Sequence, residues 1–428
     1  MLALKFTPLS LILVLLSSTA NVFSRPSSRG LKPNSISLSH KTKQPRTAAE
    51  SNMLAKFRRL AVMHKYGGPM TPMSASLMIY SQNDDEGYFA PVKLGTPGKS
   101  YDVILDTGSA DLWVAGQACT SAACAQLTKF NPKESDSFRD LKLPFQVSYA
   151  DSNVAGDLGA DTLAVGRFTI QNQTFGVASN FPNAMNDPNF ATVEKPASGI
   201  LGLAWKAFAT SNTTPFWEYL VESKQWDMPV MSLHLARSSG NSKQNTEPGG
   251  TFTLGAYDTT LYTGDIHFNN LTVTENPKKW TLPLAHILAQ GKPVSTGSET
   301  TIPAVIDSGT TYVYGPSSTI ESIYNTISGS KPDPETDGYW LYPCDTRVAI
   351  EISFADGVKW PINATDFMAD KDDSSTYCRG AFAAMPTGAE DPWIFGAAFM
   401  KNVYTVLRFS PPSVGFATLS EKALAGSG

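Results

Sequence analysis

The sequence predicts an all-β fold built from two related halves, and three observations support this prediction. Short extended segments alternate with clusters of Gly, Pro, Asn and Asp along most of the 428 residues, which is typical of short strands joined by turns. Charged residues make up only 17% of the chain and aromatic residues 11%, a composition that favours a turn-rich β protein over a helical bundle. A segment of the first half also recurs in the second half.

The first strands are predicted where apolar residues alternate or run together between turn residues. Residues 88–94, 101–105 and 145–149 have this pattern. Helical patterns are few. The clearest are at 216–223 and at 317–327, where Pro and Ser stand at the start, as they do at many helix N-termini.

The recurring segment indicates a duplicated lobe. Residues 103–109 read Val-Ile-Leu-Asp-Thr-Gly-Ser, and residues 304–310, 201 positions later, read Ala-Val-Ile-Asp-Ser-Gly-Thr. Further along the chain, each copy is followed by two apolar residues and a glycine, which is Gly202 in the first half and Gly396 in the second. Two halves with the same plan predict a pseudo-two-fold axis between them.

The two aspartates of the repeat, Asp106 and Asp307, are the candidate catalytic groups. One Asp-Thr-Gly is weak evidence, because Asp and Gly are ordinary β-turn residues. Here there are two copies, each at the exit of an apolar strand. Because burying a carboxylate at such a place is costly, the two copies indicate that both aspartates have a function. Facing one another across the axis, the two carboxyls would share one proton. One could then activate a water molecule as a general base while the other acts as a general acid.

The neighbouring residues of each copy suit a support role. Glycines at Gly108 and Gly309 allow close approach of the backbone and offer N–H donors to the carboxylates. The hydroxyls of Ser109 and Thr310 can bond the outer carboxylate oxygens and orient them. This chemistry requires no metal and no cofactor.

These motifs resemble the pepsin-like (A1) aspartic proteases over about residues 75–428. The resemblance implies a bilobal fold, a central substrate cleft and a β-hairpin flap, with Asp106 and Asp307 as the catalytic dyad. Tyr149 matches the flap tyrosine of the family, and Trp113 matches the tryptophan that bonds it. From the residues alone, an ordinary strand residue is the alternative for Tyr149 and a core aromatic is the alternative for Trp113.

The resemblance also implies a disulfide between Cys119 and Cys124 and a second one between Cys344 and Cys378. It places Asp151 near the S1 pocket, where an acid would allow Lys at P1 beside large apolar residues.

Some positions depart from the pattern of the family. The flap has Ala150 and Ser152 where many relatives have glycines, which restricts the backbone of the tip. Relatives usually have Asp where this chain has Ala397 and Arg408. These two changes and the ending at 411–417 resemble the polyporopepsin-like branch of secreted fungal members.

The N-terminal residues predict a secreted precursor. Lys5, an apolar run at 9–16 and small residues after it have the layout of a signal peptide, assigned to residues 1–24. A buried core helix is the alternative for this run. Four Asn-x-Ser/Thr sites are glycosylation candidates and are compatible with secretion: Asn172, Asn212, Asn270 and Asn363. We expect an extracellular protein, with a vacuolar location as the alternative.

A basic leader precedes an acidic body. Residues 25–80 carry ten Lys or Arg and one acid, whereas residues 81–428 carry 23 Lys or Arg and 37 Asp or Glu. We interpret residues 25–75 as a removable inhibitory propeptide held by ion pairs, which acid would weaken; a disordered basic linker is the alternative. In family zymogens a propeptide lysine pairs with both aspartates, and Lys65-Tyr66 is the best match. The two catalytic lobes are then residues 76–268 and 269–428.

The sequence therefore predicts an acid-activated aspartic endopeptidase with protein and peptide substrates, inhibited by pepstatin-type compounds, bound by its own propeptide and monomeric. An acidic body and a secretory leader argue against a nucleic-acid partner, and no later segment is apolar and long enough for a membrane helix. A catalytically inactive relative would typically lack one aspartate or the flap tyrosine. A glycosidase also uses two carboxylates, but nothing in these turns would position a sugar ring.

Overall fold

The structure is a computed structural model, and it describes residues 74–82, 84–121, 124–149, 153–180, 197–239, 246–295, 302–371, 375–386 and 393–425. The predicted signal peptide, almost all of the predicted propeptide with Lys65 and Tyr66, and the flap-tip residues Ala150, Asp151 and Ser152 lie outside the described residues. The lobe boundaries stay predictions. All described residues belong to one unit, residues 63–428.

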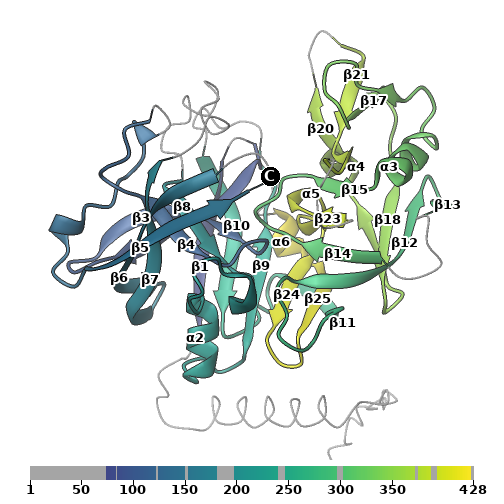
Figure 1. Ribbon diagram of the computed structural model, residues 1–428. Coiled ribbons are helices and arrows are strands. Elements are labelled where there is room, and N and C mark those ends of the chain that lie inside the picture. Colours follow the sequence, from purple (N-terminus) through teal and green to yellow (C-terminus); the bar gives the residue numbers. More distant parts are fainter. Residues whose placement is uncertain are drawn as a thin grey trace, which may run out of the picture. The chain divides into compact units, whose positions relative to one another are not determined.

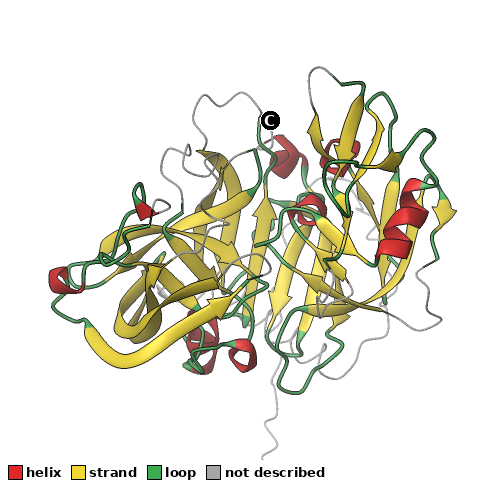
Figure 2. Cartoon of the chain, turned by 45° about the horizontal axis from the view of Figure 1, so that its top comes forward, coloured by secondary structure: helices red, strands yellow, loops and turns green. Residues whose placement is uncertain are grey.

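Strands dominate the described residues, as Figure 2 shows, and the all-β prediction is confirmed. One sheet runs through the middle of the unit. Its thirteen strands in the described part of the chain, in hydrogen-bonded order, are β11 (Tyr262–Asn270), β25 (Ser413–Leu419), β24 (Tyr404–Arg408), β9 (Val230–Leu235), β10 (Thr246–Leu254), β1 (Ala75–Gln82), β2 (Gly87–Leu94), β3 (Lys99–Asp106), β8 (Gly199–Gly202), β4 (Leu112–Ala115), β7 (Phe168–Asn180), β6 (Asn153–Val165) and β5 (Arg139–Ser148).

Two further sheets belong to the second half. The strands of the larger one are β19 (Lys359–Ile362), β18 (Ile350–Phe354), β12 (Thr281–Ala289), β14 (Ile302–Ile306), β23 (Trp393–Phe395), β15 (Val313–Gly315) and β22 (Phe382–Ala384), with β13 (Lys292–Pro293) paired to β12. The strands of the smaller one are β16 (Lys331–Pro332), β17 (Trp340–Pro343), β21 (Tyr377–Gly380) and β20 (Met368–Lys371).

The helices of the described residues are short, and all but the last of them lie between strands along the chain. They are α2 (Phe216–Glu222), α3 (Ser317–Tyr324), α4 (Ala364–Phe367), α5 (Ala397–Met400), α6 (Glu421–Ala425) and the 3₁₀ turns η2 (Pro132–Glu134) and η5 (Lys206–Phe208). Both predicted helices, at 216–223 and 317–327, are confirmed as α2 and α3. The second ends at Tyr324, earlier than expected, because the chain continues as a turn. Among the residues that the structure describes, no helix has the length and apolar character to cross a bilayer.

The two halves repeat one strand arrangement around the recurring segment. In the first half β3 pairs in parallel with β8, which pairs antiparallel with β4. In the second half β14 pairs in parallel with β23, which pairs antiparallel with β15. β4 and β15 each pair in parallel with one more strand, β7 and β22. The duplication predicted from the sequence is therefore present in the strand order.

Alternating burial explains why the segment before Asp106 forms a strand. Tyr101, Val103 and Leu105 of β3 all point into the core and are at most 2% exposed. Residues two apart lie on the same face of a strand, so this alternation buries one face of β3 continuously. The strand ends where Asp106 begins the turn. An apolar core thus brings a carboxylate to the end of a buried strand.

The middle of the large sheet joins the two halves. β24 and β25 come from the end of the chain and β9 and β10 from its first half, and β24 pairs directly with β9. Figure 1 shows these strands between the blue strands of the first half and the green strands of the second.

A buried histidine lies inside this joining region. His234 of β9 is 3% exposed, and within the described part of the chain its Nε2 has no hydrogen-bond partner. Burial disfavours the imidazolium and lowers the pKa of His234 from 6.5 to about 4. The joining sheet therefore contains a histidine that is neutral in the folded chain at mildly acidic pH.

We predict that His234→Gln makes the stability of the protein less sensitive to acid. Between pH 6.5 and about 4 the unfolded chain binds a proton that folded His234 does not. The stability that the neutral imidazole contributes is thus complete above pH 6.5 and is lost as pH falls to about 4, by about 3 kcal/mol. Urea unfolding of both proteins at several pH values measures the difference. Parallel pH curves for the two proteins would contradict this prediction.

Candidate active site

The two aspartates of the repeat meet at the contact between the two halves. Asp106 is the last residue of β3 and is 6% exposed, and Asp307 directly follows β14. A Cβ atom built on Gly108 would overlap the carboxylate of Asp307, and one built on Gly309 would overlap that of Asp106. Each glycine therefore packs against the opposite aspartate, and any larger residue would force the carboxyls apart.

Matching bonds hold the two carboxylates. The backbone N–H of Gly108 donates to Asp106 Oδ1 at 2.8 Å, and that of Gly309 donates to Asp307 Oδ1 at 2.9 Å. The outer oxygens accept from hydroxyls: Ser109 Oγ donates to Asp106 Oδ2, and Thr310 Oγ1 donates to Asp307 Oδ2 at 2.7 Å. The structure thus brings together all six residues that the sequence assigned to the dyad and its support.

The environment favours the protonated form of Asp106. Burial, and after it the negative charge of Asp307, raise the pKa of Asp106 above the ordinary range of a carboxyl, although the bonds from Ser109 and Gly108 oppose this shift. A site with two contacting carboxyls and a raised pKa can hold one proton between them.

Two further residues of the repeat were missed by the sequence analysis. Thr107 Oγ1 donates to the carbonyl of Ile306 at 2.8 Å, and Ser308 Oγ donates to the carbonyl of Leu105 at 2.6 Å. The same hydroxyls accept from the opposite backbone, because Thr107 N–H donates to Ser308 Oγ and Ser308 N–H donates to Thr107 Oγ1. These four bonds join the two aspartate turns directly. Their only signal in the sequence is the hydroxyl at the middle of each Asp-Thr/Ser-Gly.

The predicted flap tyrosine lies beside the dyad. Tyr149 follows β5, which forms a hairpin with β6, and Trp113 Nε1 of β4 donates to Tyr149 Oη at 2.7 Å. Burial and the charge of Asp106 raise the pKa of Tyr149. The bond from Trp113 therefore holds the tyrosine of the hairpin against β4, near Asp106.

Asp111 is a third residue that the sequence analysis did not single out. It is buried, and its carboxylate accepts bonds from the backbone N–H and hydroxyl of both Thr210 and Ser211. Asp111 thus fastens the segment after η5 to the strand that carries Trp113.

The predicted disulfides and glycosylation sites do not belong to the dyad or its support. Disulfides join Cys119 to Cys124 and Cys344 to Cys378, as the family resemblance implied. All four glycosylation candidates are exposed: Asn172, Asn212, Asn270 and Asn363. Asn363 also caps α4, accepting from the N–H of Thr365.

Comparison with known proteins gives a direct family match. The family model described as eukaryotic aspartyl protease matches residues 87–419. Major aspartyl peptidase 1 of Cryptococcus neoformans is 37% identical over 347 residues, which cover 78% of this chain and 69% of that protein. Pepsin A of Sus scrofa is 30% identical over 78% of this chain and 82% of its own length. Aspartic-type endopeptidase ctsD of Aspergillus fumigatus is 30% identical over 82% of this chain and 69% of that protein.

The matched region contains both aspartate turns, both disulfides and Tyr149. Together with the duplicated strand order and the paired carboxyls, it confirms the resemblance recognised in the sequence: the chain belongs to the eukaryotic aspartyl protease family, with the bilobal all-β fold of pepsin-like enzymes.

Proposed function

We propose that this aspartic endopeptidase hydrolyses peptide bonds with Asp106 and Asp307, which activate a water molecule between them. The observation that carries the proposal is the contact of two carboxyls from two halves of the chain, each held by the same pair of donors. Family membership supports the reaction class, and the geometry supports the choice of residues.

The proposed reaction uses the single proton of the pair. Two carboxyls in contact do not both ionise readily, because their negative charges would repel each other. One carboxyl is therefore ionised and the other protonated over an acidic range of pH. The ionised group removes a proton from water as the water oxygen attacks the peptide carbonyl carbon, while the protonated group donates to the carbonyl oxygen. When the tetrahedral intermediate collapses, the C–N bond breaks. The carboxyl that took the proton of water gives it to the leaving nitrogen, and the other carboxyl takes a proton from one hydroxyl of the intermediate, so the pair again holds one proton. Activity is lost as pH rises through the raised pKa of the pair, because the general acid is then ionised.

Substrate contacts come from the hairpin of β5 and β6 in this proposal. Tyr149, held by Trp113, would cover a bound peptide and limit the access of water. We further propose that pepstatin-type inhibitors bind the dyad through a hydroxyl that mimics the tetrahedral intermediate. Asp151, outside the described residues, stays the candidate for accepting Lys at P1.

We also propose that the enzyme is made as a secreted, monomeric zymogen. The charge contrast between residues 25–80 and the acidic body supports inhibition by ion pairs that weaken on acidification. The signal-like segment at 1–24 supports entry into the secretory pathway, and the exposed sequons are compatible with it. An extracellular destination is proposed, with the vacuole as the alternative.

Replacing one carboxyl by its amide should abolish turnover and preserve the fold. We expect Asp307→Asn to lower kcat on casein or a peptide by about 10³-fold or more at acidic pH, because an amide can neither take nor give the proton. Circular dichroism checks that the variant is folded. Persisting activity in Asp307→Asn would exclude the proposed dyad, and an inactive wild type would indicate a catalytically inactive relative.

The bond between Trp113 and Tyr149 should matter for catalysis without being essential. Trp113→Phe keeps an aromatic ring at the same place and removes the N–H that donates to Tyr149 Oη. Loss of one buried bond predicts a decrease of about tenfold in kcat/KM. Steady-state kinetics on one peptide substrate measures it, with Trp226→Phe as the control for a buried tryptophan whose Nε1 has no bonding partner in the described part of the chain. Equal losses in both variants would assign no specific role to the bond.

Acid treatment should shorten the purified precursor. If residues 25–75 form an inhibitory propeptide, acidification of the wild type should cause cleavage of this leader and lower the mass of the protein accordingly. Asp307→Asn should keep its full length. Mass spectrometry and N-terminal sequencing measure the new terminus. A wild-type precursor that stays intact but inactive in acid would contradict self-processing.

A further inference from the structure

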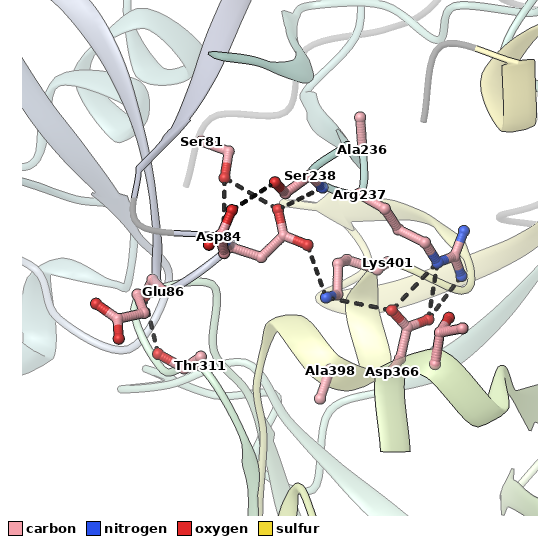
Figure 3. A network of polar contacts seen from close by, with 12 residues as sticks. Ser81, Asp84, Glu86, Ala236, Arg237, Ser238, Thr311, Asp366, Ala398 and Lys401 are labelled. Atoms are coloured by element: carbon pink, nitrogen blue, oxygen red, sulfur yellow. Dashed lines mark hydrogen bonds and ion pairs between the residues drawn. The ribbon is translucent and has the colours of Figure 1, made fainter. Parts of the chain in front are cut away.

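A second cluster of charged side chains lies at the contact between the two halves, away from the dyad. It alternates acid and base in the order Asp85, Lys401, Asp366, Arg237. Lys401 Nζ lies 2.9 Å from Asp85 Oδ2 and 3.2 Å from Asp366 Oδ1. Arg237 donates through Nη2 and Nε to the carboxylate of Asp366, at 2.7 Å and 3.0 Å from Oδ2. We call these four residues the interlobe network. Figure 3 shows that Lys401 and Arg237 both bond the carboxylate of Asp366.

The interlobe network is buried and its members bond their surroundings. The side chain of Asp366 is 2% exposed and that of Lys401 is 12% exposed. Asp85 Oδ1 also accepts from Ser81 Oγ and from the N–H of Ser238, both at 2.9 Å. Two acids and two bases give no net charge. Buried ions of this kind persist only with close partners, so removing one member leaves another uncompensated.

Two of its three ion pairs connect the halves of the chain. Asp85 lies between β1 and β2, and Arg237 follows β9, both in the first half. Asp366 belongs to α4, and Lys401 directly follows α5, both in the second half. The pairs of Asp85 with Lys401 and of Arg237 with Asp366 therefore cross from one half to the other.

Helix α5 connects this network to the loop of Asp307. At its start, the N–H groups of Ala397 and Ala398 donate to the carbonyls of Thr310 and Thr311 at 2.8 Å and 2.9 Å. Thr310 is the residue whose hydroxyl orients Asp307. At its end, the N–H of Lys401 donates to the carbonyl of Ala397. One helical turn thus separates the ion pairs from the support of Asp307.

The first half reaches the same loop from the other side. Glu86, next to Asp85, accepts a bond from Thr311 Oγ1 through its carbonyl, at 2.8 Å (Figure 3). The chain then enters β2, whose residues 89–94 pair with β3, the strand that ends in Asp106. The segment at 85–86 is therefore bonded to α5, to the Asp307 loop and, through β2, to the strand of Asp106.

We infer that Lys401, through its ion pair with Asp85, is a positioning residue for catalysis: it holds α5 and the segment at 85–86 together, so that the Asp307 loop keeps its place relative to Asp106. The inference rests on the proposed function of the dyad. Small displacements of reacting groups by remote substitutions can reduce turnover by about 100-fold, whereas substrate affinity need not change. The four bonds of Thr107 and Ser308 join the turns themselves, and the network fixes the elements behind them.

The test is the double variant Asp85→Asn/Lys401→Met. It removes one of the two ion pairs that cross the halves, that of Asp85 with Lys401, leaves Asp366 paired with Arg237, and creates no uncompensated charge. We expect kcat per folded molecule to fall by about tenfold or more, with KM within about twofold of wild type. Lys401→Arg can keep the ion pairs with both Asp85 and Asp366, and we expect it to retain most of the wild-type kcat. Lys359→Met, which removes the exposed ion pair with Glu351 at 3.3 Å, serves as the matched control and should leave kcat unchanged.

The folded fraction is measured by near-ultraviolet circular dichroism at the assay temperature, so that lower stability is not mistaken for slower turnover. A folded double variant with wild-type kcat would overturn the inference and reduce the network to a stabilising contact. If the double variant does not fold, Thr311→Val removes only the bond to the carbonyl of Glu86, and it should lower kcat several-fold at unchanged KM. Wild-type kcat in that variant would equally overturn the inference. An inactive wild type would instead refute the proposed function, and the inference with it.

Discussion

Two carboxyl groups that are buried side by side repel each other once both are ionised, and the residues around the proposed active site keep them together despite that repulsion. Asp106 and Asp307 come from opposite halves, so no local turn can fix their separation. The hydroxyls of Thr107 and Ser308 do so by bonding the opposite backbone. Gly108 and Gly309 make the contact sterically possible. The shared proton of the proposed mechanism follows from this enforced proximity.

The strands and ion pairs around the two aspartate turns also keep the two carboxyls together. Parallel pairing of β3 with β8 and of β14 with β23 places each aspartate at the end of a buried strand. β24 and β9 join the halves by backbone bonds, and the interlobe network adds ion pairs behind the Asp307 loop. A hinge between the halves would move the two carboxyls relative to one another. The contacts between the halves thus form part of the catalytic arrangement in this account.

The dyad and its immediate support could be predicted because they repeat. Each copy contains the same residue types in the same order, and a repeat needs no knowledge of tertiary contacts. Asp85 and Lys401 had no such signal, because 316 residues separate them and neither belongs to a motif. Asp111 resembled any acid near a turn until its bonds to Thr210 and Ser211 were seen. The roles of Thr107 and Ser308 depend on backbone atoms of the other half, which a local pattern cannot reveal.

The central claim is that Asp106 and Asp307 share one proton, and infrared spectroscopy of protonated carboxyls tests it most directly. At about pH 6, where exposed carboxyls are ionised, we expect a carboxylic acid band in the wild type that is absent from the double variant Asp106→Asn/Asp307→Asn. Both carboxyls have to be replaced, because burial alone already favours the protonated form of Asp106. A wild type without this band, or the same band in the double variant, would contradict the shared proton.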